Sequence, residues 1–247
     1  MASDKNKVRN NIFTSFALTA SSLICLLLVV ALTFLSKAPL PSSKQPAMSL
    51  FIVINCLGAA AAVLPSRCSR IFHHRQVRPY SSAEKDERDP KGKPAILKGH
   101  HLACGGFSTH VINVGDRTYC AGCSGLLIGA LTAIAASIAY STAVFRFETE
   151  AIYMFCFGSI MVLVGLVQYV KPFMMKGSIH FALNMSFVIG AFFLLVGVIE
   201  ISGDLSIEMY LLAITLYWIL IRVLMSDREH ERICAECEQR SCTHSLQ

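Results

Sequence analysis

GHHLACGGFSTHVINVGDRTYCAGCSG, residues 99–125, is the stretch around which the chain is organised, because this polar segment lies between long apolar runs. Its histidines and cysteines are His100, His101, Cys104, His110, Cys120 and Cys123. The last two form a Cys-x-x-Cys motif, a spacing that places two thiolates close enough to bind one metal ion. The stretch therefore predicts a metal-binding loop between membrane spans.

The composition predicts a membrane protein. Of 247 residues, 54% are hydrophobic and 15% are charged, whereas soluble domains average about 45–50% and about 25%. Six apolar runs lie near residues 12–36, 47–66, 125–145, 151–170, 178–200 and 205–225. Each is close to the ~20 residues that cross a bilayer core as a helix. We therefore expect an all-α integral membrane protein with six transmembrane helices and a cytoplasmic Cys/His metal knuckle.

The distribution of basic residues predicts the orientation in the membrane. With six spans, both termini and the loop at residues 67–124 share one face, which holds 19 of the 22 lysines and arginines. The opposite face holds Lys37, Lys44 and Arg146. The positive-inside rule then places the richer face in the cytoplasm. The membrane is expected to be the cell membrane. The acidic residues near the poorer face, which we expect to be solvated, are Glu200, Asp204 and Glu208.

This topology divides the chain into five parts. Residues 1–66 form an N-terminal hairpin of two spans, residues 67–98 a basic cytoplasmic linker, and residues 99–124 the metal-binding loop. Residues 125–226 form a four-span helical bundle, and residues 227–247 a cytoplasmic tail. The tail contains a second cluster of metal-ligand residues, namely Cys234, Cys237, Cys242 and His244.

The ten cysteines fall into two groups. Those in or beside apolar spans, where a thiol acts as a small hydrophobic group, are Cys25, Cys56, Cys68 and Cys156. The other six lie in the two cytoplasmic segments, where the glutathione pool disfavours disulfides, so metal binding explains them better. The accompanying histidines favour zinc over the alternative, an iron–sulfur cluster. The loop and the tail form either one shared site or two, and inert thiols are the remaining alternative.

Two patterns inside the spans indicate packing. His180 and Asn184 are one helical turn apart, so they share a face that must point into protein rather than lipid. They either bond neighbouring helices or, with Gln168, contribute to transport. A second pattern of small residues at four-residue spacing, which predicts close helix packing, comprises Gly125, Gly129 and Ala133.

The residues at 100–107 and 119–129 resemble the signature of a family of bacterial and archaeal predicted membrane proteins of unknown function. That signature pairs an early Cys-His and a Phe with a later Cys-x-x-Cys-Thr-Gly that leads into a glycine-bearing helix. In this chain Gly99 stands in place of the first cysteine and Ser124 in place of the threonine. The resemblance implies a small multi-span protein and supplies no activity.

The chain lacks the common catalytic signatures. No Walker loop, dinucleotide fingerprint, Gly-x-Ser-x-Gly elbow or His-Glu-x-x-His motif occurs. We therefore expect a non-enzymatic accessory or assembly subunit of a larger membrane complex, with a structural zinc site. Its expected partners are the lipid bilayer and other membrane subunits or further copies of itself, and no nucleic acid. The alternatives are an electron-transfer subunit that carries an iron–sulfur cluster and a small transporter.

Overall fold

The computed structural model describes residues 2–36, 44–63, 110–114, 117–142, 149–167 and 176–236. The helices of this part are α1 (Ala2–Leu35), α2 (Gln45–Val63), α4 (Ala121–Thr142), α5 (Ala151–Val167), α6 (Gly177–Ser202) and α7 (Leu205–Glu236). A short antiparallel hairpin, β1 (Val111–Val114) paired with β2 (Arg117–Cys120), leads directly into α4. Apart from this hairpin, the regular structure of the described residues is helical, as expected.

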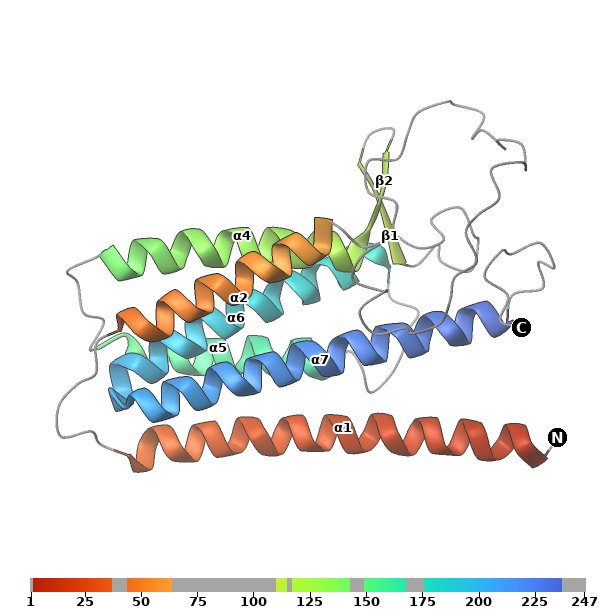
Figure 1. Ribbon diagram of the computed structural model, residues 1–247, viewed down its shortest axis with the longest axis horizontal. Helices are drawn as coiled ribbons and strands as arrows, with labels where there is room; N and C mark the ends of the chain where they lie inside the picture. Colours follow the sequence, from red (N-terminus) through yellow and green to blue (C-terminus); the bar gives the residue numbers. More distant parts are fainter. Residues whose placement is uncertain are drawn as a thin grey trace.

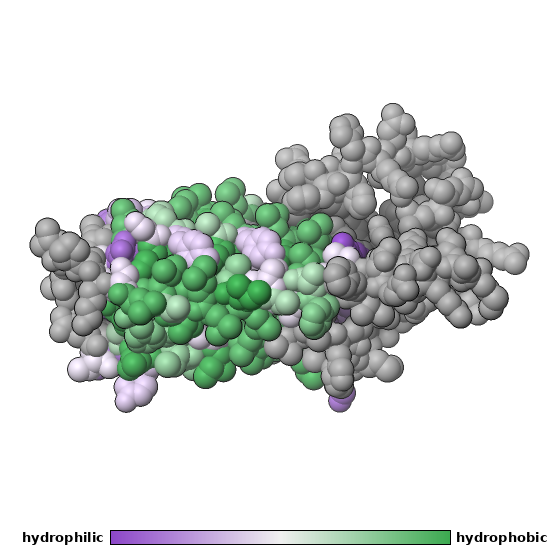
Figure 2. Space-filling view, turned by 90° about the horizontal axis from the view of Figure 1, so that it is seen from below, coloured by the Kyte–Doolittle hydropathy of each residue, from purple (hydrophilic) through white to green (hydrophobic). Residues whose placement is uncertain are grey.

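Five of these helices are long and apolar enough to cross a membrane. The segments are Phe16–Leu35, Gln45–Val63, Ala121–Thr142, Gly177–Ser202 and Leu205–Ser226. Large apolar side chains such as Leu27, Leu131 and Ile160 are exposed on the bundle, and Figure 2 shows a predominantly hydrophobic surface over the helices. The chain is therefore a multi-pass membrane protein that contacts a lipid bilayer. Since α5 is shorter than the other five helices, the described residues contain five helices of spanning length where the sequence predicts six.

Consecutive helices of the bundle run in opposite directions (Figure 1). As a result, the start of α1, the β hairpin, the start of α6 and the end of α7 all lie at one end, which we call the hairpin end. The opposite end holds the tight turn between α6 and α7, where Gly203 adopts a left-handed φ of 58°. The two sequence segments richest in cysteine and histidine thus adjoin helices that meet at the same end of the bundle.

Helix α6 is the centre of the bundle. Its side chains Leu194, Leu195 and Val198 are fully buried, because α4, α5 and α7 all pack around it (Figure 1). On α5, Gly158 lies so close to α6 that an added Cβ would lie 2.8 Å from the carbonyl oxygen of Gly190. Contacts of this kind are how helices associate in lipid, where van der Waals packing replaces the hydrophobic effect.

The small-residue strip on α4 packs against α6 of the same chain. A Cβ on Gly125 would collide with the carbonyl oxygen of Phe181, and one on Gly129 would lie 3.1 Å from that of Met185. Ala133, one turn further on, is also buried. The prediction of close packing is therefore confirmed. The helix that covers the strip is α6 of the same chain.

The end of the bundle opposite the hairpin is tied by polar contacts. Ser36, after α1, donates a hydrogen bond to Asp204 over 2.9 Å, and Tyr140 of α4 donates one to Glu200 of α6 over 2.6 Å. Glu208 is fully buried, so the prediction that it is solvated is wrong. Glu208 lies one turn before the buried Leu211 on the same face of α7, and this face points into the bundle.

Two helices extend beyond the predicted spans. The third span was expected to begin after Cys123, but α4 begins at Ala121, so Cys123 lies in its first turn. The apolar part of α7 ends at Ser226, beside the expected start of the tail at residue 227, and the helix continues to Glu236 and includes Cys234. Both differences have one cause: hydropathy marks where the hydrocarbon core begins, whereas backbone hydrogen bonds decide where a helix begins and ends.

Candidate functional site

Two cysteines mark the junction between the hairpin and α4. Cys120 is the last residue of β2 and Cys123 lies three residues later, in the first helical turn. Both are thiols rather than halves of a disulfide. The Cys123 thiol donates a hydrogen bond to the Cys120 sulfur, which also accepts hydrogen bonds from the backbone N–H groups of Cys123 and Gly122. Cys120 therefore takes the place of a helix N-cap, with sulfur as the acceptor for N–H groups that have no partner inside the helix.

These contacts favour the ionised form of Cys120, which lies just outside the apolar segment Ala121–Thr142. The hydrogen bond from Cys123 is the largest contribution, and with the N–H groups and the nearby Arg222 charge it lowers the pKa of Cys120 from 9.0 to about 6, against the opposing effect of burial. These contacts therefore favour the thiolate, the form of cysteine that binds metals.

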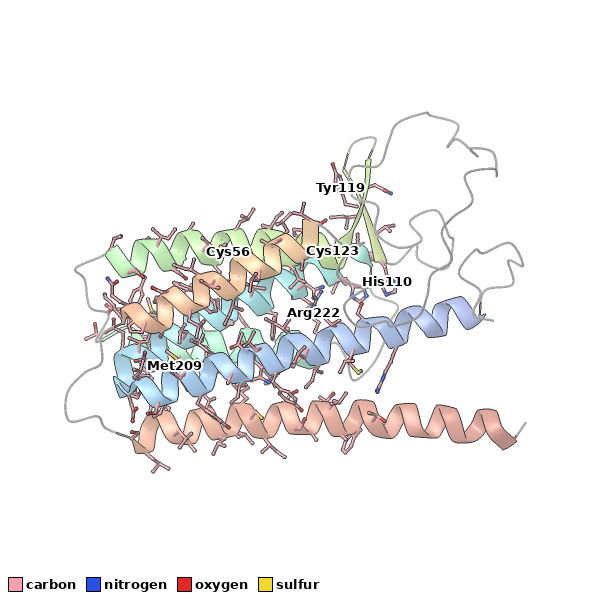
Figure 3. The ribbon with its side chains drawn as sticks, viewed as in Figure 1. Cys56, His110, Tyr119, Cys123, Met209 and Arg222 are labelled. Carbon is pink, nitrogen blue, oxygen red and sulfur yellow. The ribbon has the colours of Figure 1, made fainter. Side chains whose placement is uncertain are left out.

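Arg222 of α7 lies at the point where three helices meet. Its Nε donates a hydrogen bond to Oδ1 of Asn184 on α6 over 2.7 Å. A Cβ on Gly122 of α4 would lie 3.4 Å from the Arg222 guanidinium. The glycine thus lets α4 approach closely enough for the guanidinium charge to act on Cys120. Figure 3 shows Arg222, Cys123 and His110 gathered at the hairpin end, far from Met209.

Sequence reasoning missed this role for Arg222. The structure explains the role, because Trp218 lies one helical turn earlier on the same face of α7 and is fully buried. A basic residue in phase with a buried tryptophan faces the bundle rather than the lipid headgroups.

The hairpin is docked on the first turns of α6. The ring of His110, just before β1, stacks on that of His180, with centroids 5.0 Å apart and planes inclined by 19°. A Cβ on Gly177 would collide with the backbone carbonyl of Val111. One turn after His180, Asn184 is buried and its Nδ2 donates a hydrogen bond to the His180 carbonyl over 2.6 Å. These two residues, selected from the sequence as an intramembrane pair, therefore join the hairpin and α7 to α6.

The structure describes only part of the predicted ligand set. Cys120 and Cys123 form one pair and His110 and His180 another, and within the described ranges no three His, Cys, Asp or Glu residues approach closely enough to hold a metal ion. Of Cys234, only the helical backbone is described. The predicted ligands outside the described residues are His100, His101, Cys104, Cys237, Cys242 and His244.

The Cys pair has two chemical capabilities. Two thiolates three residues apart at the start of a helix can supply two of the four ligands of a tetrahedral Zn²⁺ ion, and two thiols in contact can exchange with a disulfide. Comparison with known proteins does not choose between them, since no family model, no curated protein and no solved structure matches the chain.

Proposed function

We propose that this chain is a six-span, non-enzymatic subunit of a membrane complex that binds a thiophilic metal ion, zinc in the first instance, at its cytoplasmic hairpin end. Cys120 and Cys123 supply two of the ligands. The observation that carries the proposal is the contact between these two sulfurs at the start of α4, which lowers the pKa of Cys120.

Three features of the pair suit a metal. The thiolate is the form of cysteine that coordinates Zn²⁺, and a low pKa means that little proton release is needed at neutral pH. The hairpin and α4 fix the backbone on both sides of the pair. The Arg222 guanidinium supplies a positive charge beside the pair, which offsets the negative charge that several thiolates place on a zinc site.

A closed zinc site needs four ligands, so we propose that the other two come from the remaining cysteines and histidines of residues 99–109 and 234–244. The placement of the helices supports this, because α7 carries Cys234 at the same end of the bundle as the hairpin (Figure 1). A site assembled in this way would join α4 to α7 and hold the hairpin end together. This is a structural role, as closed four-ligand zinc sites generally have.

We assign α5 as the sixth span because its glycines pack it along α6, which itself spans the bilayer by length. With six spans the hairpin end holds most of the basic residues, and the positive-inside rule supports its placement in the cytoplasm.

The test is the metal content of the full-length protein, purified in detergent under reducing conditions. We expect about one zinc per chain in the wild type and its loss in the double variant Cys120→Ser, Cys123→Ser. The matched control is Cys56→Ser, Cys156→Ser, since both residues are exposed on apolar helices away from the pair; it should keep the metal. No stoichiometric metal in the wild type would overturn the proposal. If the protein showed the visible absorbance of an iron–sulfur cluster, the proposed cofactor would be that cluster instead of zinc, and the proposed function would be electron transfer.

A further inference from the structure

We propose that the junction of α4, α6 and α7 at the hairpin end binds a phosphate group through Arg222, Asn184 and Trp218. The inference goes beyond metal binding and uses no sulfur ligand. It starts from a buried donor, because Trp218 is fully buried and its indole Nε1–H has no hydrogen-bond partner within the described residues. An unsatisfied N–H group inside a bundle in lipid is costly, so it indicates an acceptor from outside the chain.

Trp218 and Arg222 are neighbours in the interface between α6 and α7. They lie one helical turn apart on the same face of α7. The Trp218 ring packs edge-on against Phe187 of α6, with centroids 6.3 Å apart. Arg222 donates its hydrogen bond to Asn184, one turn from Phe187 on the same helix. The two contacts are therefore successive layers of one antiparallel helix pair, and they bring the donor groups of Trp218, Arg222 and Asn184 together.

Two of these donors border α4 at a glycine. A Cβ on Gly122 would lie 3.4 Å from Nη2 of Arg222 and 3.6 Å from Nδ2 of Asn184. The hydrogen bond from Arg222 to Asn184 uses Nε, and the one from Nδ2 to the His180 carbonyl uses one of two amide hydrogens. The Arg222 contact with Cys120 is Coulombic. The absent side chain of Gly122 thus leaves space where Nη2 and Nδ2 can donate to one acceptor.

This set of donors favours an anion over a water molecule. The Arg222, Asn184 and Trp218 nitrogens all donate, and the guanidinium carries a full positive charge. A water molecule among them would also have to place its own hydrogens on acceptors, whereas an oxyanion only accepts. The hydrogen-bond partner of Arg222 is the neutral amide of Asn184 rather than a carboxylate. A phosphate group supplies both the negative charge and several acceptor oxygens.

The depth of the junction suits a phosphate group from either side of the membrane surface. Arg222 is partly exposed, and it lies one turn before Ser226, where the apolar part of α7 ends. Figure 3 shows it at the hairpin end of the bundle. Basic pockets between spanning helices on the cytoplasmic side bind anionic headgroups of lipids. A soluble phosphate offers the same oxygens, so the experiment has to distinguish these two sources.

The experiment observes Trp218 directly, because it is the only tryptophan of the chain. Tryptophan labelled with a heavy nitrogen isotope therefore gives a single indole N–H signal by NMR. The full chain is exchanged into a sugar-based detergent, which carries no phosphate. Separate samples are titrated with inorganic phosphate, with short-chain phosphatidic acid, and with diacylglycerol of the same acyl chains.

We expect a saturable downfield shift of the indole proton with a phosphate-bearing ligand and no shift with diacylglycerol. Saturation at a lower concentration of phosphatidic acid than of inorganic phosphate assigns the site to a lipid headgroup. The opposite order assigns it to a soluble phosphate. A group that remains bound through purification would appear as stoichiometric phosphorus in the wild type that Arg222→Gln loses, and this result also supports the inference.

Three variants test the position of the bound group. Arg222→Gln should weaken binding by about 10- to 100-fold, since it removes charge-assisted hydrogen bonds. The matched control is Arg228→Gln, which removes the same charge from α7 at a position about 120° around the helix axis, and it should bind as the wild type does. Gly122→Ala keeps all three donors but fills the space beside Nη2 and Nδ2, so it should also weaken binding.

The inference is overturned if the wild type contains no stoichiometric phosphorus and neither phosphate-bearing ligand shifts the indole signal. A shift that diacylglycerol reproduces, or wild-type affinity in Arg222→Gln or Gly122→Ala, overturns it equally. The wild-type titration needs no variant to fold. It also needs no bound metal, so its result is independent of the metal content that tests the proposed function.

Discussion

Arg222 on α7 donates a hydrogen bond to Asn184 on α6 over 2.7 Å, and the same guanidinium faces Gly122, two residues after Cys120. The Arg222 side chain thus links α6 to α7 and also places a positive charge beside the Cys120–Cys123 pair. The contact lies at the hairpin end, where the hairpin, α4, α6 and α7 meet (Figure 3).

The first prediction concerns the strength of this contact. Asn184→Leu should destabilise the protein by about 1–2 kcal/mol, because it removes an interhelical hydrogen bond to a charged group; such bonds in membrane proteins average about 0.6 kcal/mol and reach about 1.7. The matched control is Asn55→Leu, since the buried Asn55 side chain donates to the Phe51 carbonyl on its own helix. Unfolding in detergent, followed by circular dichroism, should show the larger loss for Asn184. Equal losses would mean that the contact with Arg222 adds nothing.

The second prediction concerns the reactivity of Cys120 in metal-free protein. Its alkylation rate should rise with pH to half of its maximum near pH 6, because the pKa of Cys120 is lowered to about 6. Cys123→Ala should move this midpoint upward more than Arg222→Gln does, since it removes the hydrogen-bond donor that is the larger cause. Mass spectrometry of peptide 118–146 measures the rate. A wild-type midpoint near 9 would contradict the described hydrogen bonding.

The same shift has a consequence for stability. Because the pKa of Cys120 is lower in the folded state than the ordinary value of 9.0, the folded state binds fewer protons between these values. The stabilisation is therefore complete above pH 9 and is lost as the pH falls through about 6. In metal-free protein, the contribution of Cys120 should raise the unfolding temperature between pH 6 and pH 9, and Cys120→Ser should remove that contribution.

The third prediction tests the packing around α6. A Cβ on Gly197 would lie 2.7 Å from Cα of Phe155 on α5, so Gly197→Ala must push two helices apart and should cost about 1–3 kcal/mol. Gly58 on α2 has nothing within 4 Å of an added Cβ. Gly58→Ala should therefore be neutral or stabilising by up to about 1 kcal/mol, through its better helix propensity. Similar losses in both variants would show that packing against α5 is not the cause.

The sequence predicts the class of this fold because lipid imposes a length and a composition on every spanning helix. It predicts the strip of Gly125 and Gly129 for the same reason: close approach needs small residues whatever helix lies opposite. It does not say which helix that is, since the contact with α6 depends on how separate spans assemble. The burial of Glu208 and the role of Arg222 were missed because both depend on the rotation of α7 about its own axis, which hydropathy alone does not record.

The hairpin was missed for a different reason. Val111–Val114 and Arg117–Cys120 are only four residues each, too short for alternation to stand out inside a segment read for its metal ligands. Without the hairpin, nothing in the sequence indicates that Cys120 ends a strand and caps α4. The Cys-x-x-Cys spacing predicts a pair of ligands, whereas the thiolate character of Cys120 follows from its position at that helix terminus.

The fourth prediction concerns topology. In a background without other reactive thiols, a reporter cysteine at Asn113, exposed in the hairpin, should react with a membrane-impermeant maleimide only after the cells are permeabilised. One at Thr149, exposed at the opposite end of the bundle, should react in intact cells. The reverse pattern would place the hairpin end outside the cell and remove the cytoplasmic assignment.

The most direct test of the proposed metal site is X-ray absorption at the zinc edge of the purified wild-type protein. We predict sulfur scatterers at about 2.3 Å, with fewer of them in Cys123→Ser and no change in Cys56→Ser. A spectrum with nitrogen and oxygen ligands alone, or one that Cys123→Ser leaves unaltered, would contradict the assignment of Cys120 and Cys123 as ligands.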